Sequence, residues 1–150
     1  MVRFVLIGVL AITSAGCAPT AEQQAAAFSP TATALAERAR ETRRFDTPDI
    51  DLMLRASIGV LQDLGYVAEE TQTEFGVIVA SKFAGGRIRA QIVVKPTADR
   101  RAVVVRANFQ RVLPGPGATL ARGEVLTDAT IYQGFFDKLA QSVFLTAHEI

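Results

Sequence analysis

The spacing of apolar residues changes from a helical period to a period of two near residue 65, and this change most constrains the fold. In the segment 45–66, FDTPDIDLMLRASIGVLQDLGY, apolar side chains recur every three or four residues, which predicts an amphipathic helix over 48–64. Thr47 can cap its N-terminus, Pro48 suits the first helical position, and Gly65 supplies the left-handed residue that ends a helix. The face expected to be buried carries Ile50, Met53, Leu54, Ser57, Val60, Leu61 and Leu64.

After this helix, apolar and polar residues alternate in four segments. We expect strands at 66–72, 76–82, 87–94 and 103–110. The turn sequence TADRR between the last two segments predicts that they pair as a hairpin. Because each strand has one apolar and one polar face, we expect an antiparallel sheet that is covered on one side only.

Three further segments complete the predicted order. A loop containing glycine and proline is expected over 113–128, and a helix capped by Thr127 or Asp128 follows it to the C-terminus. The segment 35–45 is expected to be a helix or loop that runs into a short strand. The fold class is therefore α+β, with a single antiparallel sheet of about four to five strands and two helices packed on one face, since each helix has one apolar stripe to bury. This order of elements resembles the helix-grip type of domain.

The chain begins with the features of a secretory leader. Arg3 is the single charge among residues 1–16, and an unbroken apolar run extends from Phe4 to Ile12. This run is shorter than the roughly 20 residues that a membrane-spanning helix needs. We therefore expect the segment to be removed rather than retained as a membrane span.

The only cysteine of the chain, Cys17, directly follows small residues. The sequence Ser14-Ala15-Gly16-Cys17 resembles the lipobox of bacterial lipoproteins, in which the cysteine is lipidated and becomes the new N-terminus. The resemblance implies a lipoprotein signal peptide over 1–16, cleavage between Gly16 and Cys17, and lipidation of Cys17. The alternative is a free, inert thiol in an ordinary secretory peptide, although a lone cysteine is unusual in an exported protein.

The same resemblance implies where the protein is located. Ala18 follows the cysteine in place of the aspartate that would resemble an inner-membrane retention signal, so we expect attachment through lipidated Cys17 to the periplasmic face of the outer membrane of a Gram-negative cell. Residues 17–34 are mostly Ala, Thr, Gln, Ser and Pro, which predicts a flexible tether. Residues 35–150 then form the α+β periplasmic domain.

Residues that could support catalysis or bind a metal are few. His148 is the only histidine and Cys17 is expected to carry lipid, so a zinc site of His and Cys cannot be assembled, and we expect no metal and no cofactor. Glu69 and Glu70 are neighbours on a predicted strand, so they should point to opposite faces and could not act on one substrate. We therefore expect that the protein is not an enzyme.

Charge restricts the class of partner. Of the 16 basic and 15 acidic residues, Arg3 would leave with the leader, giving 15 of each, and this neutrality argues against nucleic acid as a partner. Arg87, Arg89 and Arg106 are nevertheless predicted on the polar face of the sheet, where they could meet an anionic partner. The alternative is a solvated sheet face that is balanced by nearby acids.

Together, these features predict a non-enzymatic binding or scaffold module of the cell envelope, with another envelope protein as its partner. The order of elements over 45–112 is similar to that in the domains of the accessory lipoprotein of the outer-membrane β-barrel assembly machine, a resemblance of topology that implies no binding residue. Two alternatives are a carrier that grips a lipid or other small ligand between helix and sheet, and a periplasmic enzyme that acts on the cell wall. The sequence predicts no oligomeric state.

Overall fold

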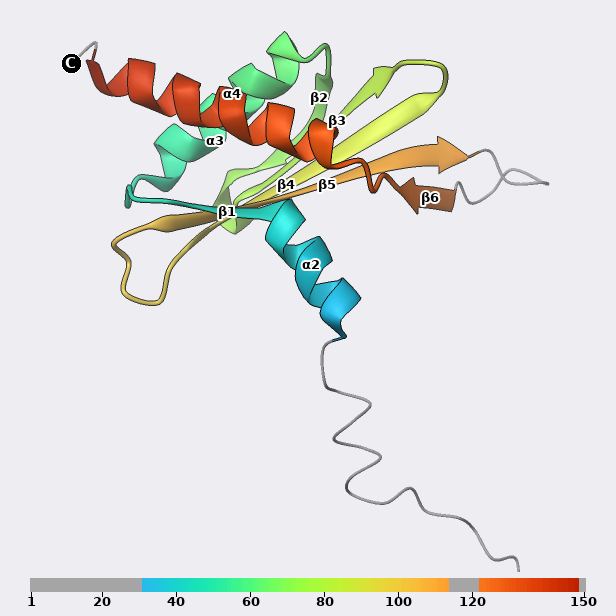
Figure 1. Ribbon diagram of the computed structural model, residues 1–150. Coiled ribbons are helices and arrows are strands. Elements are labelled where there is room, and N and C mark those ends of the chain that lie inside the picture. The colour runs from blue at the N-terminus through green and yellow to red at the C-terminus, as the bar shows by residue number, and fades with distance from the viewer. Residues whose placement is uncertain (1–30, 114–121, 149–150) are drawn as a thin grey trace, which may run out of the picture. The chain divides into compact units, whose positions relative to one another are not determined.

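The fold is α+β, as the sequence predicts, and consists of one antiparallel sheet with helices packed against it. The computed structural model describes residues 31–113 and 122–148. In these residues the strand order is β1-β5-β4-β3-β2, with β6 also paired to β5 (Figure 1). The elements are α2 (Ala32–Glu41), β1 (Thr42–Phe45), α3 (Ile50–Asp63), β2 (Val67–Gln72), a 3-10 turn (Thr73–Phe75), β3 (Val77–Phe83), β4 (Arg87–Pro96), β5 (Val103–Leu113), β6 (Arg122–Val125) and α4 (Ala129–His148).

The predicted helix over 48–64 is present as α3, but its N-terminal cap differs from the prediction. Asp49, not Thr47, is the N-cap, and its carboxylate accepts a hydrogen bond from the Leu52 amide at 2.8 Å. Pro48 therefore lies before the cap rather than in the first turn. A carboxylate at this position also opposes the positive end of the helix dipole, which favours Asp49 over the threonine.

The C-terminus of α3 confirms the role predicted for Gly65. Gly65 has a φ of 81° and its amide donates to the Gln62 carbonyl at 2.9 Å, while the Tyr66 amide donates to the Leu61 carbonyl at 2.9 Å. These two bonds form a Schellman motif, which turns the chain directly from the helix toward β2.

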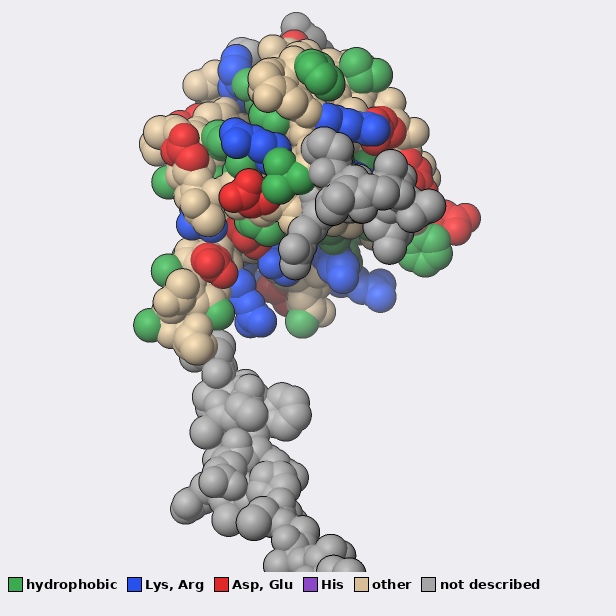
Figure 2. All heavy atoms as spheres, turned by 90° about the vertical axis from the view of Figure 1, so that its right-hand side faces the viewer, with side chains coloured by type: hydrophobic (Ala, Val, Ile, Leu, Met, Phe, Trp, Pro, Cys, Tyr) green, Lys and Arg blue, Asp and Glu red, His purple; other side chains and the backbone are tan. Residues whose placement is uncertain are grey.

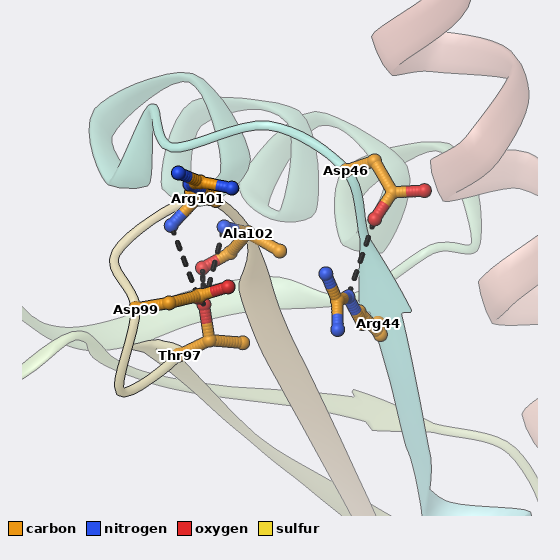
Figure 3. Close-up of polar contacts among 6 residues, drawn as sticks. All are labelled: Arg44, Asp46, Thr97, Asp99, Arg101 and Ala102. Atoms are coloured by element: carbon orange, nitrogen blue, oxygen red, sulfur yellow. Dashed lines mark hydrogen bonds and ion pairs between the residues drawn. The ribbon is translucent and has the colours of Figure 1, made fainter.

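The predicted hairpin is present as β4 and β5, which are longer than expected. Ten residue pairs join them, from Arg87 opposite Val112 to Pro96 opposite Val103. Inward-facing residues of β4 and β5 alternate with more exposed ones, as the period of two predicts. The loop 97–102 between the strands is closed by Thr97, whose amide donates to the Ala102 carbonyl at 2.9 Å and whose hydroxyl oxygen accepts from the Ala102 amide at 3.2 Å (Figure 3).

The sheet has more strands, and the domain more helices, than the four to five strands and two helices expected. The segment 35–45 is a helix that runs into a strand, which is one of the two forms predicted for it. This helix, α2, begins at Ala32, so its first three residues belong to the predicted tether.

β6 contradicts the expectation of an unbroken loop over 113–128. Its four residues are too few to show a period, and they form a strand because they pair with the end of β5. Within 113–128, residues 114–121 lie outside the described residues.

The core lies between the sheet and the two helices α3 and α4, which cover the same side of the sheet (Figure 1). Phe109 of β5 is at its centre, with ring centroids 5.2 Å from Tyr132, 5.9 Å from Phe135 and 6.0 Å from Tyr66. Asp128 caps α4 by accepting a hydrogen bond from the Thr130 amide at 2.9 Å, which settles the choice between the two predicted caps. Among the described residues, no helix covers the opposite side of the sheet.

Candidate functional site

The side of the sheet that faces away from α3 and α4 is the candidate site, and we call it the open face. Residues opposite each other on paired strands share a face, so the register assigns its members. They alternate with the core residues along each strand and are mostly exposed or half-buried, Val79 being the exception. Across β3, β4 and β5 the open face consists of Val77, Val79, Ser81, Phe83, Arg87, Arg89, Gln91, Val93, Lys95, Val104, Arg106, Asn108, Gln110 and Val112.

The three predicted arginines all lie on the open face, but the structure does not bring them together. Arg89 is opposite Gln110, whereas Arg106 is opposite Val93, four residues further along β4. At about 3.3 Å per residue, this separation is about 13 Å. The open face therefore has an Arg87 end, with Arg87 and Arg89, and an Arg106 end, with Arg106 and Lys95.

The Arg87 end is balanced by an acid. Arg87 donates a hydrogen bond to Glu69, and Ser81 Oγ donates to Glu69 Oε1 at 2.6 Å. The hydrogen bond from Ser81, followed by the hydrogen bond and charge of Arg87 and the charge of Arg89, lowers the pKa of Glu69 below its ordinary value. At this end, the alternative of a solvated face balanced by nearby acids fits the contacts best.

The expectation that Glu69 and Glu70 point to opposite faces is wrong. A β-bulge between Ala68 and Glu70 inserts an extra residue in β2, so Glu70 is opposite Val79 while Glu69 reaches Ser81, and both acids lie on the open face. They still do not form a pair, because Glu70 contacts Gln72 instead. A bulge interrupts the strict alternation of a strand, and the alternation alone could not predict it.

The Arg106 end is organised by a buried acid. Glu41, the last residue of α2, accepts hydrogen bonds on Oε2 from Arg106 Nε at 3.1 Å and from Arg106 Nη2 at 2.8 Å. The side chain of Glu41 is 6% exposed, whereas that of Arg106 is 54% exposed. Two N–H donors of the Arg106 guanidinium are thus bound by Glu41, while about half of the Arg106 side chain is exposed to solvent on the open face.

Two adjoining hollows lie on either side of Arg106 and share its side chain and Val93. One has a volume of about 230 Å³ and is lined by Gln91, Val93, Arg106, Asn108 and Gln110. The other has a volume of about 290 Å³ and is lined by Thr42, Val93, Lys95, Val104 and Arg106. Each hollow therefore has an apolar floor of valine with polar and cationic groups around it.

The polar groups of the hollows are only partly satisfied. Among the described residues, no acid lies within ion-pair distance of Lys95. In the same part of the chain, nothing donates a hydrogen bond to the shielded Oδ1 of Asn108. Gln110 lies against Gly123 of β6, where a Cβ atom would come within 2.4 Å of its Oε1, so β6 limits the space available to this amide.

Beside the Arg106 end, the β4–β5 loop adds further arginines and its own acid. Asp99 accepts a hydrogen bond from the Thr97 hydroxyl and another from the Arg101 amide, and these bonds, in that order, lower the pKa of Asp99 (Figure 3). Arg44 on β1 pairs with Asp46 at 3.2 Å. Figure 2 shows another side of the domain, on which basic and acidic side chains are interspersed rather than gathered into one patch.

Sequence reasoning missed Glu41, Lys95, Asn108 and the role of α2. The alternation placed Asn108 on the polar face but gave no reason to select it, and the predicted strand ended one residue before Lys95. The contact between Glu41 and Arg106 joins residues 65 positions apart, and no local pattern indicates it.

Several predicted sites fall outside the described residues. These are the signal peptide 1–16, the cleavage site at Gly16, the lipidation site Cys17 and the side chain of His148. Within 31–113 and 122–148, no group of three or more His, Cys, Asp or Glu side chains could hold a metal ion. The described helices include none with the length and apolar character to cross a membrane.

Comparisons with protein-family models and with curated proteins gave no match to this chain.

Proposed function

We propose that the protein is a lipoprotein anchored through Cys17 to the periplasmic face of the outer membrane, where it acts as a non-enzymatic binding module for an envelope protein. The leader and the sequence Ser14-Ala15-Gly16-Cys17 support the anchor. The observation that carries the binding role is the Arg106 end of the open face, where Arg106, held by Glu41, borders two hollows and Lys95, which pairs with no acid among the described residues, borders one of them. Such an uncovered surface, with partly satisfied polar groups, is suited to a partner.

The packing of the core argues against the alternative of a ligand carrier. A carrier would need space between the helices and the sheet, and in this domain Phe109, Tyr132 and Phe135 fill the centre of that layer with edge-to-face contacts. All three side chains have no exposed surface.

The alternative of a cell-wall enzyme also has little support in the described residues. Glycoside hydrolysis uses two carboxyl groups that face one bond, one of them protonated through a raised pKa. Glu69 and Glu70 contact different neighbours, and the pKa of Glu69 is lowered rather than raised.

Site-specific photo-cross-linking in intact cells tests the binding role. A photoreactive amino acid replaces Gln91, an exposed residue in the hollow beside Arg106, and in a control it replaces Arg55, an exposed residue of α3 on the covered side. We expect a discrete cross-linked product from position 91 and none of the same size from position 55. The same product from both positions, or no product from position 91 in a protein that folds and is exported, would contradict the proposal.

A further inference from the structure

We propose that the Arg106 end of the open face binds the carboxylates of an acidic peptide segment in its partner. This inference rests on the proposed binding function and names the chemistry of the partner. The residues proposed to contact the peptide are the cationic Arg106 and Lys95 and the amides Gln91, Asn108 and Gln110.

The Arg106 guanidinium is held in place by Glu41 and is still exposed to a ligand. This group has five N–H donors in a planar fork that matches the geometry of a carboxylate. Two of its nitrogens already donate to the buried Glu41, which fixes the plane of the fork, while over half of the side chain is exposed. Less side-chain entropy is lost when a ligand binds such a preorganised group.

The spacing of the charges also suits a peptide. Lys95 is opposite Val104. On the open face, this pair comes next after the pair of Val93 and Arg106 toward the β4–β5 loop. Arg106 is directly opposite Val93, and Lys95 lies two residues from Val93 along β4, so the two cations are diagonal neighbours about 7–8 Å apart. Alternate acidic side chains of an extended peptide, which share a face about 7 Å apart, can span this distance. Because no acid in the described part of the chain pairs with Lys95, a second carboxylate gains an ion pair there without displacing a described acid.

The amides beside Arg106 favour a peptide over a simple anion. The hollow on the other side of Arg106 presents three side-chain amides, and the Asn108 Oδ1 has no donor among the described residues. Amides offer both donors and acceptors, which suit the N–H and C=O groups of a peptide backbone better than a phosphate, whose oxygens act mainly as hydrogen-bond acceptors. The half-buried Val93 and Val104 give the peptide an apolar floor.

Calorimetric titration of the purified full-length protein with a synthetic hexaglutamate peptide tests the inference. We expect binding that Arg106→Gln weakens by about tenfold, because a charge-assisted pair is lost, and that Lys95→Gln weakens by about threefold. Arg106→Lys, which keeps the charge and removes the fork, should recover only part of the loss. Arg87→Gln is the matched control, since Arg87 is almost equally exposed and is also paired with an acid, Glu69, but lies at the other end of the open face; it should change affinity by less than about twofold.

Three results would overturn the inference. These are no binding of hexaglutamate by the folded wild-type protein, an equal loss in Arg87→Gln and Arg106→Gln, and equally tight binding of inorganic phosphate at the same ionic strength. Thermal unfolding of each variant shows that the fold is retained, and Arg106→Lys and Lys95→Gln keep the test decisive if Arg106→Gln unfolds. Because the titration measures neither cross-linking in cells nor lipid attachment, its failure would leave the proposed binding module and its anchor standing with a partner of different chemistry.

Discussion

The ion pair between Glu41 and Arg106 should stabilise the domain much more than the pair between Glu69 and Arg87. The two arginines are almost equally exposed, at 54% and 52%, but the acids are not, at 6% for Glu41 and 33% for Glu69. For the more exposed pair we expect a coupling energy of about 0.5 kcal/mol, as for surface ion pairs in general. For Glu41 and Arg106 we expect about 2 kcal/mol, because two charge-assisted hydrogen bonds reach a carboxylate that has little water to replace them.

Two double-mutant cycles measured by urea unfolding at pH 7 test this difference. One combines Glu41→Gln with Arg106→Gln, and the other combines Glu69→Gln with Arg87→Gln, so that each cycle isolates the interaction within one pair. At about 4 °C per kcal/mol for a domain of this size, loss of the first interaction should also lower the melting temperature by about 8 °C. Equal coupling energies in the two cycles, or additive effects of Glu41→Gln and Arg106→Gln, would refute the view that the buried acid holds Arg106 in place.

Three further predictions follow from the fold. Gly76→Ala should destabilise the domain by about 3 kcal/mol, since a Cβ would lie 2.1 Å from the Val94 carbonyl oxygen. Gly85 has nearly the same φ but open space around it, so Gly85→Ala should destabilise the domain by about 1 kcal/mol. Urea unfolding of the two variants measures the difference. Asp49→Ala should reduce stability by about 1 kcal/mol and Thr47→Ala by clearly less in the same assay, and the reverse order would restore Thr47 as the cap. The fold lowers the pKa of the Glu69 carboxyl from 4.5, so ionised Glu69 stabilises the domain above that pH, and this stabilisation is lost as the pH falls through the folded pKa. The unfolding free energy of Glu69→Gln, measured as a function of pH, should therefore decline less on acidification than that of the wild type.

The sequence predicts those parts of the fold in which periodicity and local signals agree. The apolar stripe and Gly65 identify α3, and the alternation in β4 and β5 identifies the hairpin and its uncovered face. The predictions fail where distant pairing decides the structure. β6 is a strand only because β5 is beside it, and the bulge in β2 turns Glu69 and Glu70 to one face against the simple alternation.

The candidate site was predicted only in part for the same reason. Alternation places Arg87, Arg89 and Arg106 on one face, because it fixes which way a side chain points. It does not indicate that Arg87 is paired with Glu69 or that Arg106 is held by Glu41 from another element. Each arginine pairs with an acid from another element, and the two acids differ in burial, which depends on long-range contacts that only the folded domain reveals.

We propose that acyl chains on Cys17 hold the domain and its open face at a membrane. Intact mass spectrometry of the protein purified from its native membrane tests this anchor. We expect a chain that begins at Cys17 and carries the added mass of fatty acyl groups. A chain with an unmodified thiol at Cys17, or one that retains residues 1–16, would contradict it.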